Sequence, residues 1–246
     1  MYWEFNGQEF NEQSCRDSII CKLGNFLISK PDFFYFVGDV LITCKKHNPN
    51  NQYYDAEKIK LKLAQIVLAD NSIKRAEVKY FYSLFNEYLN NNKIKKGELL
   101  DYIIYKIGPF NIVADNVIKK RNCKINIENK LHSEKDFDVV FYSYNSNEIL
   151  SAEIIECKLD LMTFIHNPPS NKYSFSRNAE EKLELMKLIK LNKRENDIIL
   201  FYLATLRKNI ESCNEILRNK GFDFIEILNG DSLNMLLKMF VKTRNL

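Results

Sequence analysis

Two apolar, β-branched runs joined by a polar turn constrain the fold of this chain more than any other feature. Both runs lie within residues 135–160, and the Asn- and Ser-rich turn between them covers residues 143–148. Such runs on either side of a short polar turn are typical of a β-hairpin. The stretch therefore predicts two neighbouring strands of a sheet.

Three charged residues lie where these two strands would meet. Asp138 opens the first run, and Glu156 and Lys158 lie near the end of the second. Because side chains alternate between the faces of a strand, Glu156 and Lys158 point one way and Cys157 the other. The hairpin can bring two carboxylates and an ammonium to one end of a sheet, a grouping suited to a divalent cation and a phosphate.

The composition is that of an ordinary soluble globular protein. Of the 246 residues, 46% are apolar and 28% are charged, which is enough to form a sizeable core. The net charge of +4 permits a nucleic-acid partner without requiring one. No apolar stretch approaches the roughly 18 residues of a membrane span, so no membrane association is expected.

The cysteine pattern argues against a zinc site and for a cytoplasmic location. The six cysteines occur at positions 15, 21, 44, 123, 157 and 213 without a Cys-x-x-Cys pair, and the three histidines are scattered. Residues 1–10 lack both the basic start and the apolar run of a signal peptide. We therefore expect free thiols in a reducing cytoplasm.

Residues 1–92 are predicted to form a mostly helical N-terminal domain. The dense apolar run at residues 33–43 fits a buried helix or a strand, and its periodicity does not separate the two. Two helices joined by a short turn fit a helix-turn-helix, although an ordinary helical pair is the simpler interpretation. The domain is interpreted as a nucleic-acid-binding or partner-binding module.

Residues 93–246 are predicted to form a second domain in which strands alternate with helices. This pattern indicates an α/β (α+β) fold with a mixed central sheet flanked by helices on both faces. The expected order is a helix at 97–107, strands at 111–117 and 123–129 around a basic turn, the hairpin, a helix at 178–191, a strand at 197–206, a helix at 211–219, a strand at 222–228 and a helix at 233–241.

This order of elements, with the three charged residues in place, resembles the PD-(D/E)xK nuclease superfamily, the restriction-endonuclease-like fold. The resemblance covers roughly residues 96–228. The sequence Ile-Ile-Glu-Cys-Lys that ends at Lys158 is similar to the family's apolar-apolar-Glu-x-Lys strand, and Asp138 matches the acid that opens the preceding strand. Phe137 stands where the family usually has proline, a frequent departure.

A helix acid extends the resemblance. Many members of the family carry an acid a few residues after a glycine on the helix that precedes these strands. The sequence Gly-Glu-Leu-Leu-Asp from Gly97 to Asp101 fits that pattern. Asp101 stands in the acid's place, and Glu98, three residues earlier on the same helical face, is the alternative.

The resemblance implies a Mg²⁺-dependent endonuclease that hydrolyses phosphodiester bonds, with DNA expected before RNA. Asp138 and Glu156 would bind Mg²⁺ or Mn²⁺ together with the backbone carbonyl of Cys157. Lys158 would orient the attacking water and stabilise the developing negative charge. Asp101 would hold a second metal ion or position a water molecule.

Basic residues outside this group are candidate nucleic-acid contacts. Lys172 and Arg177 follow a Pro-Pro loop and open the next predicted helix, near the active site of this fold. Lys119, Lys120 and Arg121 form the densest basic patch and are candidate backbone contacts. Solvated charges in a loop and a polar hairpin turn would explain the same residues without a nucleic acid.

Two other interpretations stay open. The first is a catalytically inactive module of the same fold that binds nucleic acid or a protein partner. The second is an unrelated α/β protein in which Asp138 caps a strand and Glu156 and Lys158 form a salt bridge of little energetic weight. Carboxylates of Asp138 and Glu156 more than about 8 Å apart could not share one ion, and would favour the second interpretation.

Neighbouring residues receive simpler interpretations. Asp136 and Glu153 are interpreted as surface charges, although Asp136 shares the face of Asp138 and could assist it. Cys157 is interpreted as a buried apolar residue and not as a nucleophile. Many enzymes of this fold act as dimers, so a homodimer also stays open, but no residues identify an interface.

Overall fold

One open mixed sheet organises the chain, and the computed structural model describes residues 3–10, 18–43, 45–48, 51–69, 73–127, 130–131, 134–145, 149–165 and 175–244 of it. The neighbouring strands follow the order β1-β4-β6-β7-β8-β9, and β5 pairs with β4 at the side. The strands are β1 (Trp3–Gln8), β4 (Ile118–Ile127), β5 (Lys130–Leu131), β6 (Phe137–Tyr144), β7 (Leu150–Lys158), β8 (Ile198–Thr205) and β9 (Ile225–Leu228).

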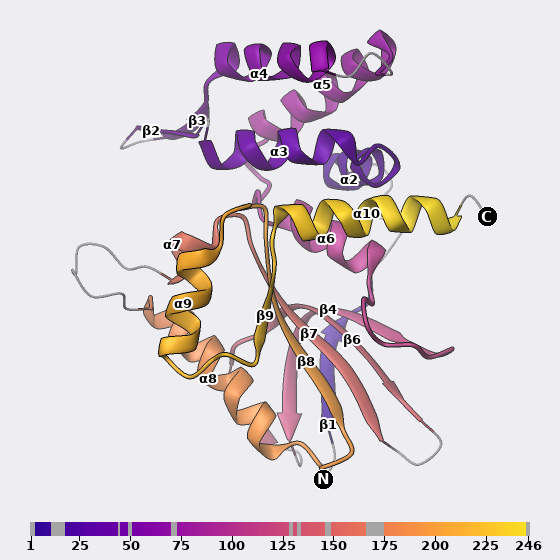
Figure 1. The fold of residues 1–246 in the computed structure, drawn as a ribbon, viewed down its shortest axis with the longest axis vertical. Coiled ribbons are helices and arrows are strands. Elements are labelled where there is room, and N and C mark those ends of the chain that lie inside the picture. The colour runs from indigo at the N-terminus through magenta and orange to yellow at the C-terminus, as the bar shows by residue number, and fades with distance from the viewer. Residues whose placement is uncertain are drawn as a thin grey trace.

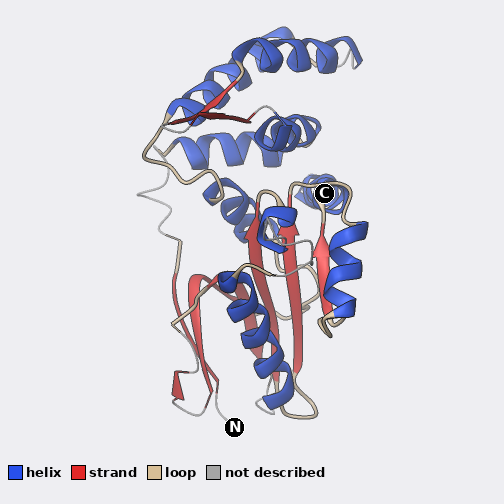
Figure 2. Cartoon of the chain, turned by 90° about the vertical axis from the view of Figure 1, so that its left-hand side faces the viewer, coloured by secondary structure: helices blue, strands red, loops and turns tan. Residues whose placement is uncertain are grey.

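Helices cover both faces of the sheet and extend beyond one of its ends (Figure 1). Figure 2 shows the same arrangement from the side, with α2 to α5 stacked beyond the sheet. The described helices are α2 (Ile19–Ser29), α3 (Asp32–Thr43), α4 (Ala56–Ala69), α5 (Arg75–Asn90), α6 (Glu98–Ile107), α7 (Leu161–Ile165), α8 (Arg177–Asn192), α9 (Glu211–Asn219) and α10 (Gly230–Arg244).

Two apolar clusters, one on each face, hold these layers together. Successive residues of β7 divide between them, since Ile155 packs with α6 and the N-terminal helices while Ile154 packs with α7, α8 and α9. Tyr202 and Leu203 of β8 divide in the same way. Strands buried on both faces read as nearly continuous apolar runs, which is the pattern that predicted this sheet.

The predicted hairpin and the order of elements predicted after it are confirmed. Strands β6 and β7 pair antiparallel, with Val140 opposite Ile154. Strand β8 runs parallel to both β7 and β9, and helices α8 and α9 make the crossovers. The result is an α/β fold with a mixed sheet, in which the carboxyl ends of β7, β8 and β9 lie at the same edge.

The expectation of a mostly helical start to the chain is wrong for the first residues. Residues Trp3–Gln8 form β1, the outer strand paired with β4, where Trp3 is buried and Phe5 stacks on Tyr142. A two-stranded sheet of β2 (Lys45–Asn48) and β3 (Asn51–Tyr54) interrupts the helices. The ambiguous run at residues 33–43 is helical, as α3.

The two strands expected around a basic turn are replaced by the single strand β4. Residues 119–121 therefore lie within a strand, and no described residue of 111–117 belongs to one. The reason is Glu153, which was expected on the surface but is fully buried. Its carboxylate accepts the backbone N–H groups of Phe110, Asn111 and Ile112 at 2.5–3.1 Å, so the start of this segment pairs with a side chain and not with a strand.

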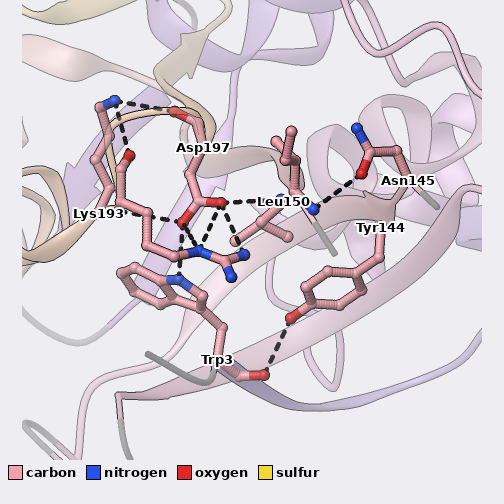
Figure 3. Close-up of polar contacts among 8 residues, drawn as sticks. Trp3, Tyr144, Asn145, Leu150, Lys193 and Asp197 are labelled. Carbon is pink, nitrogen blue, oxygen red and sulfur yellow. Dashed lines mark hydrogen bonds and ion pairs between the residues drawn. The ribbon is translucent and has the colours of Figure 1, made fainter. Parts of the chain in front are cut away.

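A second buried carboxylate, Asp197, joins three segments at the start of β7 (Figure 3). It accepts the backbone N–H of Leu150 at 3.0 Å, the indole N–H of Trp3 at 3.3 Å, and backbone and guanidinium hydrogens of Arg194 at 3.0–3.2 Å. Burial opposes its charge, but the donors of Arg194 and Leu150 outweigh burial and hold the pKa of Asp197 below its usual value.

Two expectations drawn from composition can be compared with the structure. Cys123, Cys157 and Cys213 are free and buried, as expected, whereas Cys21 is disulfide-bonded, so the expectation of free thiols is wrong there. Within the described ranges, no helix is long and apolar enough to cross a membrane. The cytoplasmic location stays a prediction.

Candidate functional site

The pairing of β6 with β7 brings the predicted charged residues together. Their register continues from Val140 and Ile154 toward Asp138 and Glu156, which makes these two acids cross-strand neighbours at one end of the sheet. The Asp138 carboxylate also accepts the backbone N–H of Cys157 at 2.7 Å. Local strand geometry therefore places the first acid directly beside the Glu-x-Lys sequence.

The ammonium of Lys158 lies at the centre of this group. It forms an ion pair with Glu156 Oε1, it donates to the Cys157 carbonyl at 3.1 Å, and it lies 3.7 Å from Asp138 Oδ2. The two carboxylates therefore lie well within the limit of about 8 Å for sharing an ion. The three oxygen groups expected to hold a metal ion all surround one cationic atom.

Asp101 adds a third carboxylate from α6. It is buried, and its oxygen, an oxygen of Asp138 and the sulfur of Cys157 all lie within 4.8 Å of one another. The guanidinium of Arg121 lies 4.0 Å from Asp101. Among the described residues it is therefore Asp101, and not the alternative Glu98, that joins the group from this helix.

Lys182 belongs to the site and was not identified from the sequence. Its ammonium lies 2.5 Å from Glu156 Oε2, and the residue is only 6% exposed on α8. The signal was present, because Lys182 occupies a core-facing position of an amphipathic helix between the buried Ala179 and Met186. Glu156 is thus paired with one lysine at each of its two oxygens.

Burial and mutual repulsion dominate the electrostatics of the acids. Burial and the Asp138 charge raise the pKa of Asp101 to about 8, against the lowering effect of Arg121 and Lys158. The same two causes raise the pKa of Glu156 above its usual value. Burial would lower the pKa of Lys158, but Glu156 and Asp138 outweigh it and raise that pKa. Burial and repulsion therefore disfavour the ionised forms of Asp101 and Glu156, and a nearby divalent cation would favour them.

The donor atoms of the group fit a hard cation. Mg²⁺ and Mn²⁺ prefer carboxylate and carbonyl oxygens, which Asp138, Glu156 and Cys157 supply. The thiol of Cys157 is a weaker candidate ligand, because burial and the neighbouring acids raise its pKa well above the usual value. This burial also supports the interpretation of Cys157 as a packing residue and not as a nucleophile.

The expected basic patch at residues 119–121 is not formed as an exposed turn. Lys119 donates to the Gly108 carbonyl at 2.6 Å, Lys120 pairs with Glu9 at 2.9 Å, and Arg121 is the neighbour of Asp101. These side chains diverge because alternate residues of β4 point to opposite faces. Arg177 is 93% exposed and pairs with Glu181, and Lys172 lies outside the described residues.

Comparison with known proteins gives no family for this arrangement. No protein-family model matches the chain, and no curated protein is significantly similar to it. What the group can do must therefore be inferred from its own geometry and charge.

Proposed function

We propose that the protein is a Mg²⁺- or Mn²⁺-dependent endonuclease that hydrolyses phosphodiester bonds, with DNA as its substrate before RNA. The observation that carries this proposal is the convergence of the Asp138, Glu156 and Cys157 oxygens on one cationic atom, the Lys158 ammonium. The sequence resemblance to the PD-(D/E)xK superfamily supports the choice of reaction and of DNA.

Each residue has a defined role in this proposal. Asp138, Glu156 and the Cys157 carbonyl would hold the ion, which supplies Lewis acidity when bound. Lys158 would give up its present position and donate hydrogen bonds to the attacking water and to the developing negative charge. Asp101, buried beside Asp138, would orient a water molecule or hold a second ion.

Cleavage and metal binding should be measured together on matched variants. The wild type should cleave one or more of single-stranded DNA, duplex DNA, branched DNA and RNA, and EDTA should stop the reaction. Asp138→Ala should lose both the Mn²⁺ site in isothermal titration and the cleavage. Asp223→Ala removes an exposed carboxylate outside the group, serves as the control and should keep both.

Lys158→Ala separates metal binding from the chemical step. This variant should still bind Mn²⁺, because the ammonium competes for the ion's position, but it should cleave at least a hundredfold more slowly, a loss of roughly 10²–10³ being usual for one stabilising donor. Cleavage by Lys158→Ala at the wild-type rate would exclude the proposed role of the lysine. Unchanged Mn²⁺ binding by Asp138→Ala would exclude the proposed metal site.

The alternative is a catalytically inactive module that binds nucleic acid or a protein partner. One observation favours it: both oxygens of Glu156 are already paired with lysines, so the group is closed without a metal ion. Such a module would bind no Mn²⁺ at this site, and EDTA would leave its binding to a nucleic acid or protein unchanged.

A further inference from the structure

A groove separates the N-terminal helices from the edge of the sheet that carries the candidate site. It has a volume of about 560 Å³ and lies between α3, α4 and the segment that follows β8. Tyr35, Phe36 and Asp39 line it from α3, Lys62 from α4, and Arg207 and Lys208 from the connection between β8 and α9. Figure 1 shows this connection rising toward α3.

The groove begins next to the candidate site. Lys158, at the end of β7, pairs in register with Thr205, at the end of β8. The next residues stay together, since Leu206 donates its N–H to the Leu159 carbonyl at 3.3 Å. Arg207 forms an ion pair with Asp160 at 2.7 Å. One wall of the groove is therefore continuous with the strand ends that carry Lys158.

The lining combines positive charge with an aromatic ring. Lys62, Arg207 and Lys208 outnumber Asp39, the one acid among the residues that line the groove. Lys62 pairs with Asp39, whereas no described carboxylate forms an ion pair with Lys208, whose ammonium lies 3.9 Å from the centre of the Tyr35 ring. A displaceable ammonium over an aromatic ring is suited to a phosphate and a stacked base.

We propose that this groove binds an unpaired segment of the nucleic-acid substrate, with Tyr35 stacking on a base and Lys208 and Lys62 contacting phosphates. The volume is in the range of sites for small molecules, so it admits about one or two nucleotides and is too small to enclose a duplex. This inference rests on the proposed function, because the groove wall at residues 206–208 follows directly on β8, whose end pairs with Lys158. It also gives α3 and α4 a role as one wall of the substrate site.

Binding without cleavage tests the groove separately from the chemistry. A short fluorescent oligothymidylate, the matching oligouridylate and a blunt duplex are titrated in EDTA and followed by fluorescence anisotropy. The single-stranded DNA or RNA should bind the wild type, and the duplex should bind at least tenfold more weakly.

Two variants and their controls identify the groove residues. Tyr35→Ala should weaken single-strand binding roughly fivefold or more, as expected for the loss of one stacked base. Lys208→Ala, an exposed substitution that leaves the core intact, should reduce the slope of log K against log salt by about 0.7, the loss of one phosphate contact. Tyr80→Ala on α5 and Lys60→Ala on α4 change exposed residues outside the groove and should leave binding unchanged.

The outcomes separate this inference from the proposed function. If both groove variants bound the single strand as tightly as the wild type does, while cleavage depended on Asp138, the groove proposal would be excluded. The proposed nuclease function would be unaffected. Groove-dependent binding of the duplex as tight as that of the single strand would overturn the unpaired-strand assignment. Groove-dependent single-strand binding without any cleavage would support the groove and exclude the nuclease.

Discussion

Buried carboxylates lie near both ends of β7, and their pKa values are shifted in opposite directions. At its start, Asp197 is surrounded by hydrogen-bond donors and its pKa lies below the usual value. At its end, burial and mutual repulsion raise the pKa of Asp101 and of Glu156. Both groups are taken out of water, so the difference comes from what surrounds them.

The difference lies in the donors. Asp197 is held by the guanidinium of Arg194, three residues earlier, and by backbone and ring N–H groups that the fold fixes in place, so its charge serves the structure. The acids at the other end meet two flexible lysine ammoniums and one another. Several buried carboxylates that repel one another are suited to binding a cation. A buried carboxylate whose oxygens already accept hydrogen bonds from the protein is not.

The largest expected effect concerns stability at the satisfied end. Asp197→Ala leaves the buried donors of Leu150 and Trp3 without their acceptor, at about 1–3 kcal/mol each, so we expect a loss of about 3 kcal/mol or more. Asp138→Ala also frees one N–H, that of Cys157, but it relieves repulsion with Glu156 and should cost about 1 kcal/mol or less. Urea unfolding in EDTA measures both, and equal losses would contradict the comparison.

The second prediction concerns Lys182, which fixes one oxygen of Glu156 and leaves the other directed toward Asp138 and Lys158. Partners of this kind typically change metal affinity by 10–100-fold. Lys182→Met should therefore weaken Mn²⁺ binding by about that factor, and Lys182→Arg should restore part of it. Isothermal titration measures the affinity, and the exposed Lys190→Met on the same helix is the control. Unchanged affinity in Lys182→Met would assign Lys182 to stability alone.

Sequence reasoning was most successful where local pattern decides the structure. The hairpin, the buried β8 and the meeting of Asp138 with Glu156 all follow from strand alternation and register, which short segments specify. The helix that carries Asp101 follows from its apolar periodicity. These elements include the centre of the candidate site.

The missed features depend on contacts between distant segments. Lys182 meets Glu156 across 26 positions of sequence, and Glu153 binds backbone groups of a loop about 40 residues earlier. Strand β1 joins the sheet by pairing with β4, more than a hundred residues away. A single charged residue in an apolar run indicates that the residue is buried with a polar partner, but the sequence does not identify that partner.

The third prediction reverses the usual effect of losing a charge. In the metal-free protein the ionised form of Asp101 is opposed by burial and by Asp138, so the neutral Asp101→Asn should fold more stably, by about 0.5–2 kcal/mol. The same variant should cleave more slowly, because it lacks the charge that the proposed site uses. Urea unfolding in EDTA and a cleavage assay measure the two effects. If Asp101→Asn were less stable than the wild type, the surroundings of Asp101 would stabilise its carboxylate, as those of Asp197 do.

The smallest expected effect is the response of Asp197 to acid. Its pKa is lowered in the folded state, so its stabilising effect is complete above the unfolded pKa of about 3.9 and is lost as the pH falls through the folded value. Protonation leaves an oxygen acceptor for Leu150 and Trp3, which is why this loss is smaller than that of Asp197→Ala. The stability gap between wild type and Asp197→Asn, measured by urea unfolding, should therefore narrow below about pH 4. Asp223→Asn removes one exposed carboxylate and controls for net charge. If the stability difference between wild type and Asp223→Asn narrowed equally below pH 4, the effect would come from the net charge of the protein and not from Asp197.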